Sequence, residues 1–416
     1  MTTARSGPRR PLRPPRTGAG LVVANLDADH QFARALGLGL EPPRPTKAAR
    51  ARAGVLGRLM AVLAGPDDRL IGFAGTGDDP ALWPGQSMPL VENDRIEATL
   101  AATSFAVTMP DPPNMPILPW AETRDVAALR AAMLRAANGR PAPSHRPIGH
   151  PVVDALWALA PPDPDTVARL NHRRHALRMA ESMGIERFGA ALVRSTVEVS
   201  ERLAPDGDSR RGAAEVGAAS CVVKAACSSA GRDRVWVASD GTMGADDEAR
   251  LERLFARHGE AVIEPWLDRT ADFGVVGHVD ADGQPTVVGL HRQRVDAHGR
   301  FKGIDVPLGM DVGDDRLEAL LGLRVGEAEA LRGVHRAVGL AIGALGYRGA
   351  YGIDAWHWRD AAGRTRLQPL GELNARLSMG FLGRVLADRA VAAVGPVRGA
   401  AAVDATGVVR VASAAR

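Results

Sequence analysis

The sequence predicts a mixed α/β (α+β) protein. Short runs of apolar and β-branched residues, such as residues 219–226, have the composition of buried strands. Amphipathic segments such as 246–258 alternate with these runs and predict helices that pack on sheets. Near the C-terminal end, the apolar runs 350–358 and 366–375 flank a polar segment that contains Gly363 and predicts a hairpin turn. Hairpins and helices in one chain are typical of α+β folds.

Length and composition limit the possible classes of protein. The chain has 416 residues, 45% of them hydrophobic, which is enough for two or three domains and a sizeable core. No apolar run is long enough to span a membrane, so a membrane partner is not expected. Two cysteines, Cys221 and Cys227, are too few for a disulfide framework or a zinc site and indicate a reduced, cytoplasmic protein.

The first 20 residues differ in composition from the rest of the chain. Residues 1–20 are rich in arginine, proline and glycine and predict a disordered tail, because they cannot build a core. Arg9 and Arg10 resemble a twin-arginine signal, but no apolar stretch follows them. The alternative is weak electrostatic contact with nucleic acid or another acidic surface. Because aromatic residues form only 4% of the chain and do not interleave with the tail, nucleic acid is not an expected partner through stacking.

A separate α/β region follows the tail. Residues 21–24 and 70–73 are short apolar runs that predict buried strands. Residues 55–64 and 125–137 predict helices. The glycine-rich segment 72–77 follows a strand but lacks the full G-x-G-x-x-G spacing, so it predicts a turn and not a phosphate loop.

Residues 163–184 predict one helix that leads into the second half of the chain. Asp165 is the expected N-cap, and Gly184 is the expected stop. Asn171 and Arg173 lie outside the apolar stripe, and we expect them on a solvated helix face.

Lys224 is an unusual residue for its position. It lies within the apolar run 219–226, where an ammonium group is disfavoured unless it reaches a partner. All but three of the 52 basic residues are arginine, so a lysine here indicates a specific role. The structural alternative is an ammonium group that reaches the solvent at the strand edge. A loop of small residues, 227–232, follows, and a second strand is predicted at 235–238.

The next acidic candidate is Glu264, in a strand predicted at 261–267. Residues 273–290 predict a hairpin that turns through an Asp-Ala-Asp-Gly segment. Arg292 and Arg294 follow this hairpin, and they could face either an anionic substrate or the solvent.

The C-terminal hairpin gathers carboxylates on one face. Side chains two residues apart on a strand share a face, so Glu372, Asn374 and Arg376 project together. If the turn centres on Gly363, Asp354 lies directly across from Glu372. Like charges opposed across strands repel each other, and a divalent cation such as Mg²⁺ would relieve the repulsion. The alternative is a solvated face on which Glu372 pairs with Arg376.

The pattern D…E-x-N-x-R, from Asp354 to Arg376, resembles the metal-binding end of the ATP-grasp superfamily. Asn171-x-Arg173 and Lys224 match upstream pieces of that family in the right order, so the resemblance covers about residues 171–384. It implies an ATP-grasp-like fold with an N-terminal Rossmann-like pre-domain and a lid subdomain. The units implied are a tail at 1–20, a pre-domain at 21–145, a connector and helix at 146–184, a lid at 185–262 and a core at 263–416.

The resemblance also implies roles for individual residues. ATP would be held by Lys224 on the phosphates, by the lid loop over them, by Glu264 and the backbone near the adenine, and by Asp272 at the ribose. The lid loop residues are Ser228, Ser229 and Gly231, and the adenine backbone belongs to Trp266 and Leu267. Asp354, Glu372 and Asn374 would bind Mg²⁺ or Mn²⁺. Arg376 and Lys224 would be catalytic, with Arg376 holding the acyl phosphate or the incoming carboxylate.

The activity that the resemblance implies is an ATP-dependent carboxylate–amine ligase acting on small molecules. The alternatives are a phosphotransferase of the same fold, a nucleotide-binding protein without ligase activity, and a nucleic-acid-binding module that uses the tail. Two departures leave the substrate undefined. Gly352 stands where D-alanine ligase-like members carry arginine, and Leu377-Ser378-Met379-Gly380 replaces the Q-V-E-H continuation of biotin carboxylase-like members.

Overall fold

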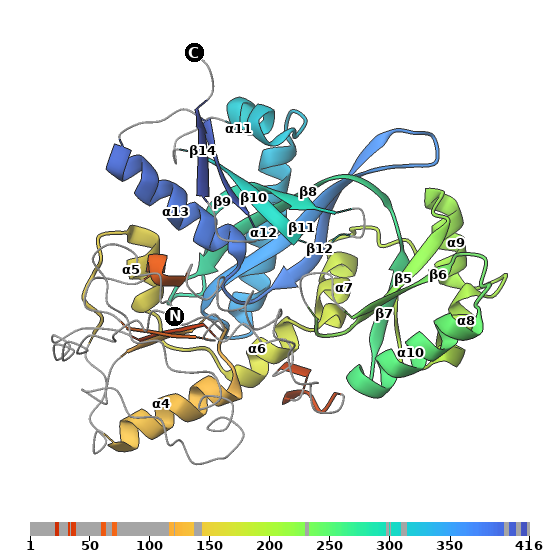
Figure 1. Ribbon diagram of the computed structural model, residues 1–416, viewed down its shortest axis with the longest axis horizontal. Helices are drawn as coiled ribbons and strands as arrows, with labels where there is room; N and C mark the ends of the chain where they lie inside the picture. Colours follow the sequence, from red (N-terminus) through yellow and green to blue (C-terminus); the bar gives the residue numbers. More distant parts are fainter. Residues whose placement is uncertain are drawn as a thin grey trace, which may run out of the picture.

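The computed structural model contains three sheets, with helices packed on them. It describes residues 21–24, 32–33, 35–38, 60–63, 69–72, 116–119, 121–136, 144–228, 233–296, 299, 301–308, 314–394, 399–404 and 409–413. In Figure 1 the N-terminal unit lies at the lower left, the largest sheet in the centre and the four-stranded sheet at the right. Within the described ranges, no helix is long and apolar enough to cross a membrane.

The N-terminal unit is built on a small parallel sheet in the order β2-β1-β3. Its strands are β1 (Leu21–Ala24), β2 (Arg69–Gly72) and β3 (Ile117–Pro119). The strand predicted at 21–24 is confirmed, and that predicted at 70–73 begins one residue earlier. The helix predicted at 125–137 is α4 (Arg124–Ala136). Of the helix predicted at 55–64, residues 60–63 form the 3-10 turn η1 (Met60–Leu63), and the rest lies outside the described residues.

The helix predicted over 163–184 is wrong, because the chain forms two helices there. After α5 (Pro151–Trp157) come α6 (Pro164–Leu170) and α7 (Arg173–Ser182). Asp163, and not Asp165, is the N-cap of α6: its carboxylate accepts the Thr166 amide at 2.8 Å. The His172 side chain accepts the Arg174 amide at 3.0 Å and so begins α7 as a new helix. Gly184, at φ +66°, follows α7 as predicted.

The four-stranded sheet is antiparallel, in the order β4-β7-β5-β6, and has its own apolar core. We call this unit the lid. Its elements are β4 (Ala191–Val193), α8 (Thr196–Leu203), α9 (Asp208–Val216), β5 (Ser220–Ala225), β6 (Arg234–Ala238), α10 (Ala245–His258) and β7 (Ala261–Pro265). The three strands and the helix predicted between residues 219 and 267 are therefore present.

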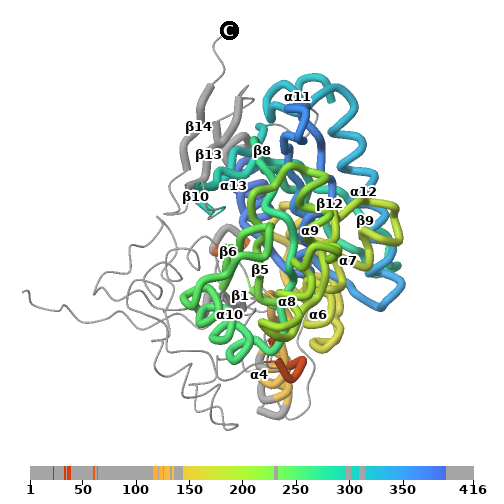
Figure 2. Tube along the Cα trace, turned by 90° about the vertical axis from the view of Figure 1, so that its right-hand side faces the viewer, coloured from red at the N-terminus to blue at the C-terminus, as the bar shows by residue number. Residues whose placement is uncertain are grey.

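The seven-stranded sheet has the order β12-β11-β8-β9-β10-β13-β14. Its strands are β8 (Asp268–Val279), β9 (Pro285–Val295), β10 (Phe301–Pro307), β11 (Gly349–Arg359), β12 (Thr365–Asn374), β13 (Gly399–Asp404) and β14 (Val409–Ser413). The helices are α11 (Asp314–Leu321), α12 (Glu327–Ala344) and α13 (Met379–Val394). Figure 2 shows the lid side of the molecule, with α12 behind the lid helices. Every strand pair of this sheet is antiparallel, as expected for an α+β fold.

His291 is a buried histidine on β9 whose environment makes stability depend on pH. Its ring lies against Gly274 and Gly380, where a Cβ atom would come within 2.3 and 2.1 Å of the imidazole. Burial lowers the pKa of His291 from 6.5 to about 4. The unfolded chain therefore binds a proton between those pH values that the folded protein does not bind, so stability is lost as the pH falls from 6.5 to 4.

We expect the free energy of unfolding to fall by roughly 3 kcal/mol across that interval because of His291, at about 1.4 kcal/mol for each pH unit. Urea unfolding at pH 7.5, 6.0 and 5.0 measures this slope. His291→Asn, which does not titrate, should flatten it. An equal slope in wild type and variant would show that His291 does not titrate in this way.

Candidate functional site

The predicted hairpin is formed by β11 and β12, and its register is the predicted one. Asp354 lies opposite Glu372, and Gly352 lies opposite Asn374. The turn uses Gly363 at φ +75°, with the Gly363 amide donating to Asp360 O at 2.8 Å. The face-to-face placement of two carboxylates is therefore confirmed by the strand pairing.

A β-bulge interrupts the hairpin beyond the two carboxylates. The register shifts between Asp354 and Trp356, and β12 contributes the extra residues. The bulge contains Gly371, and a Cβ at this position would lie 1.7 Å from the Trp356 ring. The Leu370 and Gly371 carbonyls accept hydrogen bonds from Arg187 Nη1 at 3.2 and 3.1 Å. The Arg187 side chain thus supplies hydrogen-bond donors to two carbonyl groups of the bulge, and buried carbonyl groups need such partners.

Asp354 is held by amide groups and not by a cation. Gln293 Nε2 donates to Asp354 Oδ1 at 2.7 Å, and Asn374 Nδ2 donates to Oδ2 at 3.3 Å. Burial raises the pKa of Asp354, although Gln293 and the nearby Arg376 oppose this effect. Among the described residues, Asp354 makes no ion pair. A carboxylate in this environment can accept a cation at low cost, because it is already desolvated and oriented.

Glu372 pairs with Arg173 from α7. The Arg173 guanidinium also donates to Ala225 O at 2.9 Å and to Ser228 O at 2.8 Å. The side chains of Arg173 and Glu372 are 11% and 28% exposed, so the pair is largely shielded from solvent. The expectation that Arg173 lies on a solvated helix face is therefore wrong, and so is the alternative pairing of Glu372 with Arg376.

Asn171 joins the connector to the end of β12. Its amide donates to Ala375 O at 3.2 Å, and its oxygen accepts the Ala375 amide at 3.1 Å. The same Nδ2 also donates to Val167 O at 2.8 Å, within α6. The expectation of a solvated Asn171 is wrong for a physical reason: this side chain satisfies backbone groups of two separate segments. Next to Ala375, Arg376 donates to Asn374 Oδ1 at 3.1 Å.

Lys224 and Glu264 form a buried ion pair between neighbouring strands β5 and β7 of the lid. Their side chains are 6% and 9% exposed. The second Glu264 oxygen accepts from Arg187 Nη2 at 2.7 Å. Lys224 therefore has a partner within the sheet. The alternative, an ammonium group that reaches the solvent at the strand edge, is wrong.

Burial and charge act in opposite directions in this pair. Burial lowers the pKa of Lys224, and the Glu264 carboxylate opposes that effect. Burial alone would raise the pKa of Glu264, but Lys224 and Arg187 outweigh it and hold that pKa below its usual range. The carboxylate is therefore charged, and the cations beside it are what stabilise its charge.

The remaining predicted nucleotide residues lie near the junction of the lid and the large sheet. The Trp266 amide donates to Ser220 O at 2.8 Å, and Leu267 O accepts the Arg269 amide at 2.9 Å. Asp272 on β8 accepts from Arg269 Nη1 at 3.1 Å and lies opposite Gln293 on β9. Of the predicted loop residues, Ser228 contacts Arg173, whereas Ser229 and Gly231 lie outside the described residues.

Two arginines connect the lid with the large sheet. Arg173 contacts Ala225 and Glu372, and Arg187 contacts Glu264 and the bulge. We call Arg173 and Arg187 the connector arginines. No role was predicted for Arg187 or for Gln293 from the sequence. The irregular Gln-Pro-Leu-Gly segment of β12 is a signal for the bulge, but nothing in the sequence indicates what would bind its carbonyls.

The comparisons with known proteins concern the fold. No family model and no curated protein matches the chain. The solved ADP complex of N5-carboxyaminoimidazole ribonucleotide synthetase is 15% identical, with a TM-score of 0.43, over 89% of this chain and 72% of that chain. Biotin carboxylase from Campylobacter jejuni is 13% identical, with a TM-score of 0.45, over 86% of this chain and 65% of that chain.

D-alanyl-alanine synthetase A from Vibrio cholerae is 11% identical, with a TM-score of 0.43, over 88% of this chain and 92% of that chain. The chain itself contains a parallel N-terminal sheet, an antiparallel lid and a larger antiparallel sheet that carries the carboxylate hairpin. The mixed α+β class predicted from the sequence is therefore confirmed.

Proposed function

We propose that the protein is an ATP-dependent ligase of the ATP-grasp type, which activates a carboxylate and couples it to an amine. The observation that carries this proposal is the opposed pair Asp354 and Glu372, with Asn374 beside it, on a hairpin that Arg173 joins to the strand of Lys224. Oxygen ligands and cations at one junction suit a bound metal–triphosphate.

ATP would bind between the lid and the large sheet. Lys224 would donate to the phosphates, and the loop with Ser228, Ser229 and Gly231 would cover them. Glu264 and the backbone of Trp266 and Leu267 would receive the adenine, and Asp272 the ribose. The lid and the core would correspond to the units predicted at 185–262 and 263–416, with β7 of the lid extending to Pro265, and the pre-domain to 21–145.

The donor set on the hairpin fits a hard divalent cation. Asp354 and Glu372 offer carboxylate oxygens and Asn374 offers an amide oxygen, and Asp354 has no ion pair among the described residues. Mg²⁺ or Mn²⁺ held there would neutralise phosphate charge when the nucleotide is bound. Arg173 already pairs with Glu372, so the negative charge of Glu372 is largely neutralised before a metal ion binds.

The proposed reaction begins when a carboxylate oxygen of the substrate attacks the γ-phosphorus of ATP. The bond between that phosphorus and the β,γ-bridging oxygen breaks, and ADP leaves with the electron pair. The amine then attacks the acyl phosphate carbon, expels inorganic phosphate and loses a proton. Arg376 would hold the carboxylate and then the acyl phosphate as a planar fork. Such a site works mainly by positioning and charge stabilisation.

We expect ADP release with Mg²⁺ only when a carboxylic acid is present, and an amide product only when an amine is also present. Pooled acids and amines, with ADP measured by a coupled assay and products by mass spectrometry, test this. A stable phosphorylated product without an amine would favour the phosphotransferase. Nucleotide binding without ADP release from any pool would contradict both and leave a nucleotide-binding protein.

A further inference from the structure

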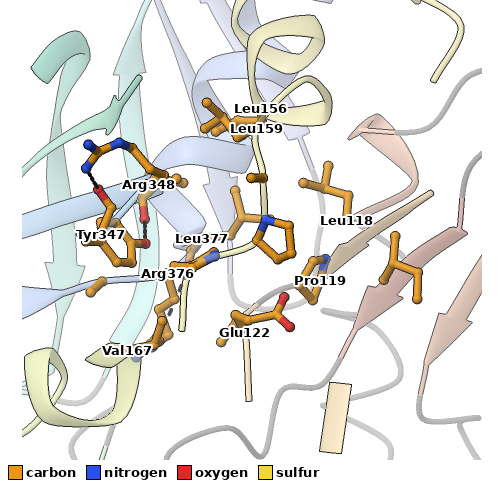
Figure 3. A pocket seen from close by; sticks show the side chains of 18 of the residues that line it. Leu118, Pro119, Glu122, Leu156, Leu159, Val167, Tyr347, Arg348, Arg376 and Leu377 are labelled. Atoms are coloured by element: carbon orange, nitrogen blue, oxygen red, sulfur yellow. Dashed lines mark hydrogen bonds between the residues drawn. The ribbon is translucent and has the colours of Figure 1, made fainter. Parts of the chain in front are cut away.

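A small apolar cavity adjoins Arg376 on the side that faces the N-terminal unit. Its volume is about 70 Å³. Figure 3 shows its aliphatic walls, which come from the N-terminal sheet, α5 with the segment after it, α6 and the end of the hairpin. These wall residues are Leu118, Leu156, Leu159, Val167 and Leu377.

Two polar side chains beside the cavity are committed to other protein groups. The Arg348 guanidinium donates to Gly343 O at 2.8 Å and to Tyr347 O at 2.7 Å. The Tyr347 hydroxyl donates to Ala350 O, and burial raises the pKa of that hydroxyl. Neither group is therefore suited to bind a charged ligand.

Glu122 and Arg130 border the same cavity as a mutually neutralised pair. Their side chains meet at 2.8 Å, with the Glu122 side chain 4% exposed, and Arg130 also donates to Ile117 O at 3.3 Å. Burial raises the pKa of Glu122, while Arg130 opposes that effect. A second negative charge on a ligand would meet the Glu122 carboxylate, so this end of the cavity disfavours dicarboxylic acids.

Arg376, at the end of the carboxylate hairpin, also lines the cavity. Its guanidinium contacts Asn374 Oδ1 at 3.1 Å and Leu377 O at 3.4 Å. A guanidinium has five N–H donors, so it can also bind a carboxylate. Arg376 thus stands between the carboxylate hairpin and an aliphatic cavity.

We propose that this cavity receives the aliphatic chain of the carboxylate substrate, and that the substrate is a monocarboxylic acid with a short, uncharged chain. The inference rests on the proposed function, because it assigns the carboxylate to Arg376. A cavity of about 150 Å³ holds benzene, so about 70 Å³ accommodates roughly three or four carbon atoms. Simple fatty acids and 2-amino acids share this chemistry.

The test compares binding and turnover across chain length. Straight and branched monocarboxylic acids of two to ten carbons, and their 2-amino counterparts, are titrated by calorimetry without nucleotide and then assayed for ADP release. We expect affinity to rise about threefold to fourfold for each added methylene up to four to six carbons and then to fall. Succinate and glutarate should bind more weakly than the matched monocarboxylates. The two series show whether a 2-amino group is required.

Two variants at one partly buried wall position move the optimum in opposite directions. Leu159→Ala enlarges the cavity and should shift the best chain to longer acids, whereas Leu159→Phe should shift it to shorter ones. Leu340→Ala, on the exposed face of α12 where Leu340 is 50% exposed, is the matched control and should change nothing.

The outcomes separate this inference from the proposed function. If short acids bind with these shifts but none causes ADP release, the ligase proposal fails and the cavity assignment stands. If acids cause ADP release but neither Leu159 variant moves the optimum, the cavity assignment is overturned and the ligase proposal stands. If no acid binds in the calorimeter or supports turnover, the cavity assignment is overturned as well.

Discussion

Lys224→Met is expected to reduce ATP turnover by at least a hundredfold while the protein remains folded. The substitution keeps most of the side-chain volume and removes the charge that we assign to the triphosphate. Loss of one preorganised donor to developing charge typically costs about 10²–10³ in rate. Steady-state ADP release and equilibrium ATP binding measure the effect, and ATP affinity should fall in parallel.

The buried partner of Lys224 supplies the control. Removing one member of a buried ion pair costs roughly 3–5 kcal/mol when nothing compensates, but Arg187 remains at 2.7 Å from Glu264. We therefore expect Lys224→Met to lose less than that amount. The double variant Lys224→Met/Glu264→Gln should recover stability without recovering turnover. Recovery of turnover in the double variant would show that Lys224 serves only to neutralise Glu264.

Glu372→Gln is expected to abolish most Mg²⁺-dependent turnover with only a small change in apo stability. The variant preserves the shape of the side chain and removes one proposed metal ligand charge. Arg173 loses its ion pair but keeps Ala225 O and Ser228 O as acceptors. Because Glu372 is 28% exposed, we expect the melting temperature to fall by no more than a few degrees.

Direct Mn²⁺ binding, measured by electron paramagnetic resonance with a nonhydrolysable ATP analogue, gives a readout independent of activity. Affinity for Mn²⁺ should fall at least tenfold in Glu372→Gln. Glu329→Gln removes an exposed carboxylate on α12, where the side chain is 63% exposed, and serves as the matched control. Unchanged Mn²⁺ affinity together with a clearly lower melting temperature would assign Glu372 to the anchoring of Arg173 alone.

The hairpin could be predicted from the sequence because its determinants are local. A strand repeats every two residues, and the polar turn at Gly363 fixes the register, so the opposition of Asp354 and Glu372 follows from spacing alone. Lys224 could be singled out because lysine is rare in this chain. Its pairing with Glu264 could not be predicted, because that contact depends on which strand lies beside β5.

The errors have a common physical cause. A continuous apolar stripe predicted one helix over 163–184, but Asn171 and His172 interrupt it by forming hydrogen bonds at the junction of α6 and α7. Arg173 was expected in solvent because it lies outside the apolar stripe, but its guanidinium pairs with Glu372 and is mostly buried. These choices depend on partners distant in sequence, such as Ala375 and Glu372, which local patterns do not contain.

The connector arginines have a consequence for the thermodynamics of ligand capture. They hold the lid strands and the large sheet through residues of the protein itself. The relative motion of the lid and the large sheet is therefore already restricted in the folded protein. In the proposed ligase, ligand binding would then lose less conformational entropy, and more of the contact energy would contribute to affinity. The same contacts resist a wide separation of the lid and the large sheet. In the proposed ligase, product release would therefore either stretch these guanidinium contacts or follow a route that leaves them intact.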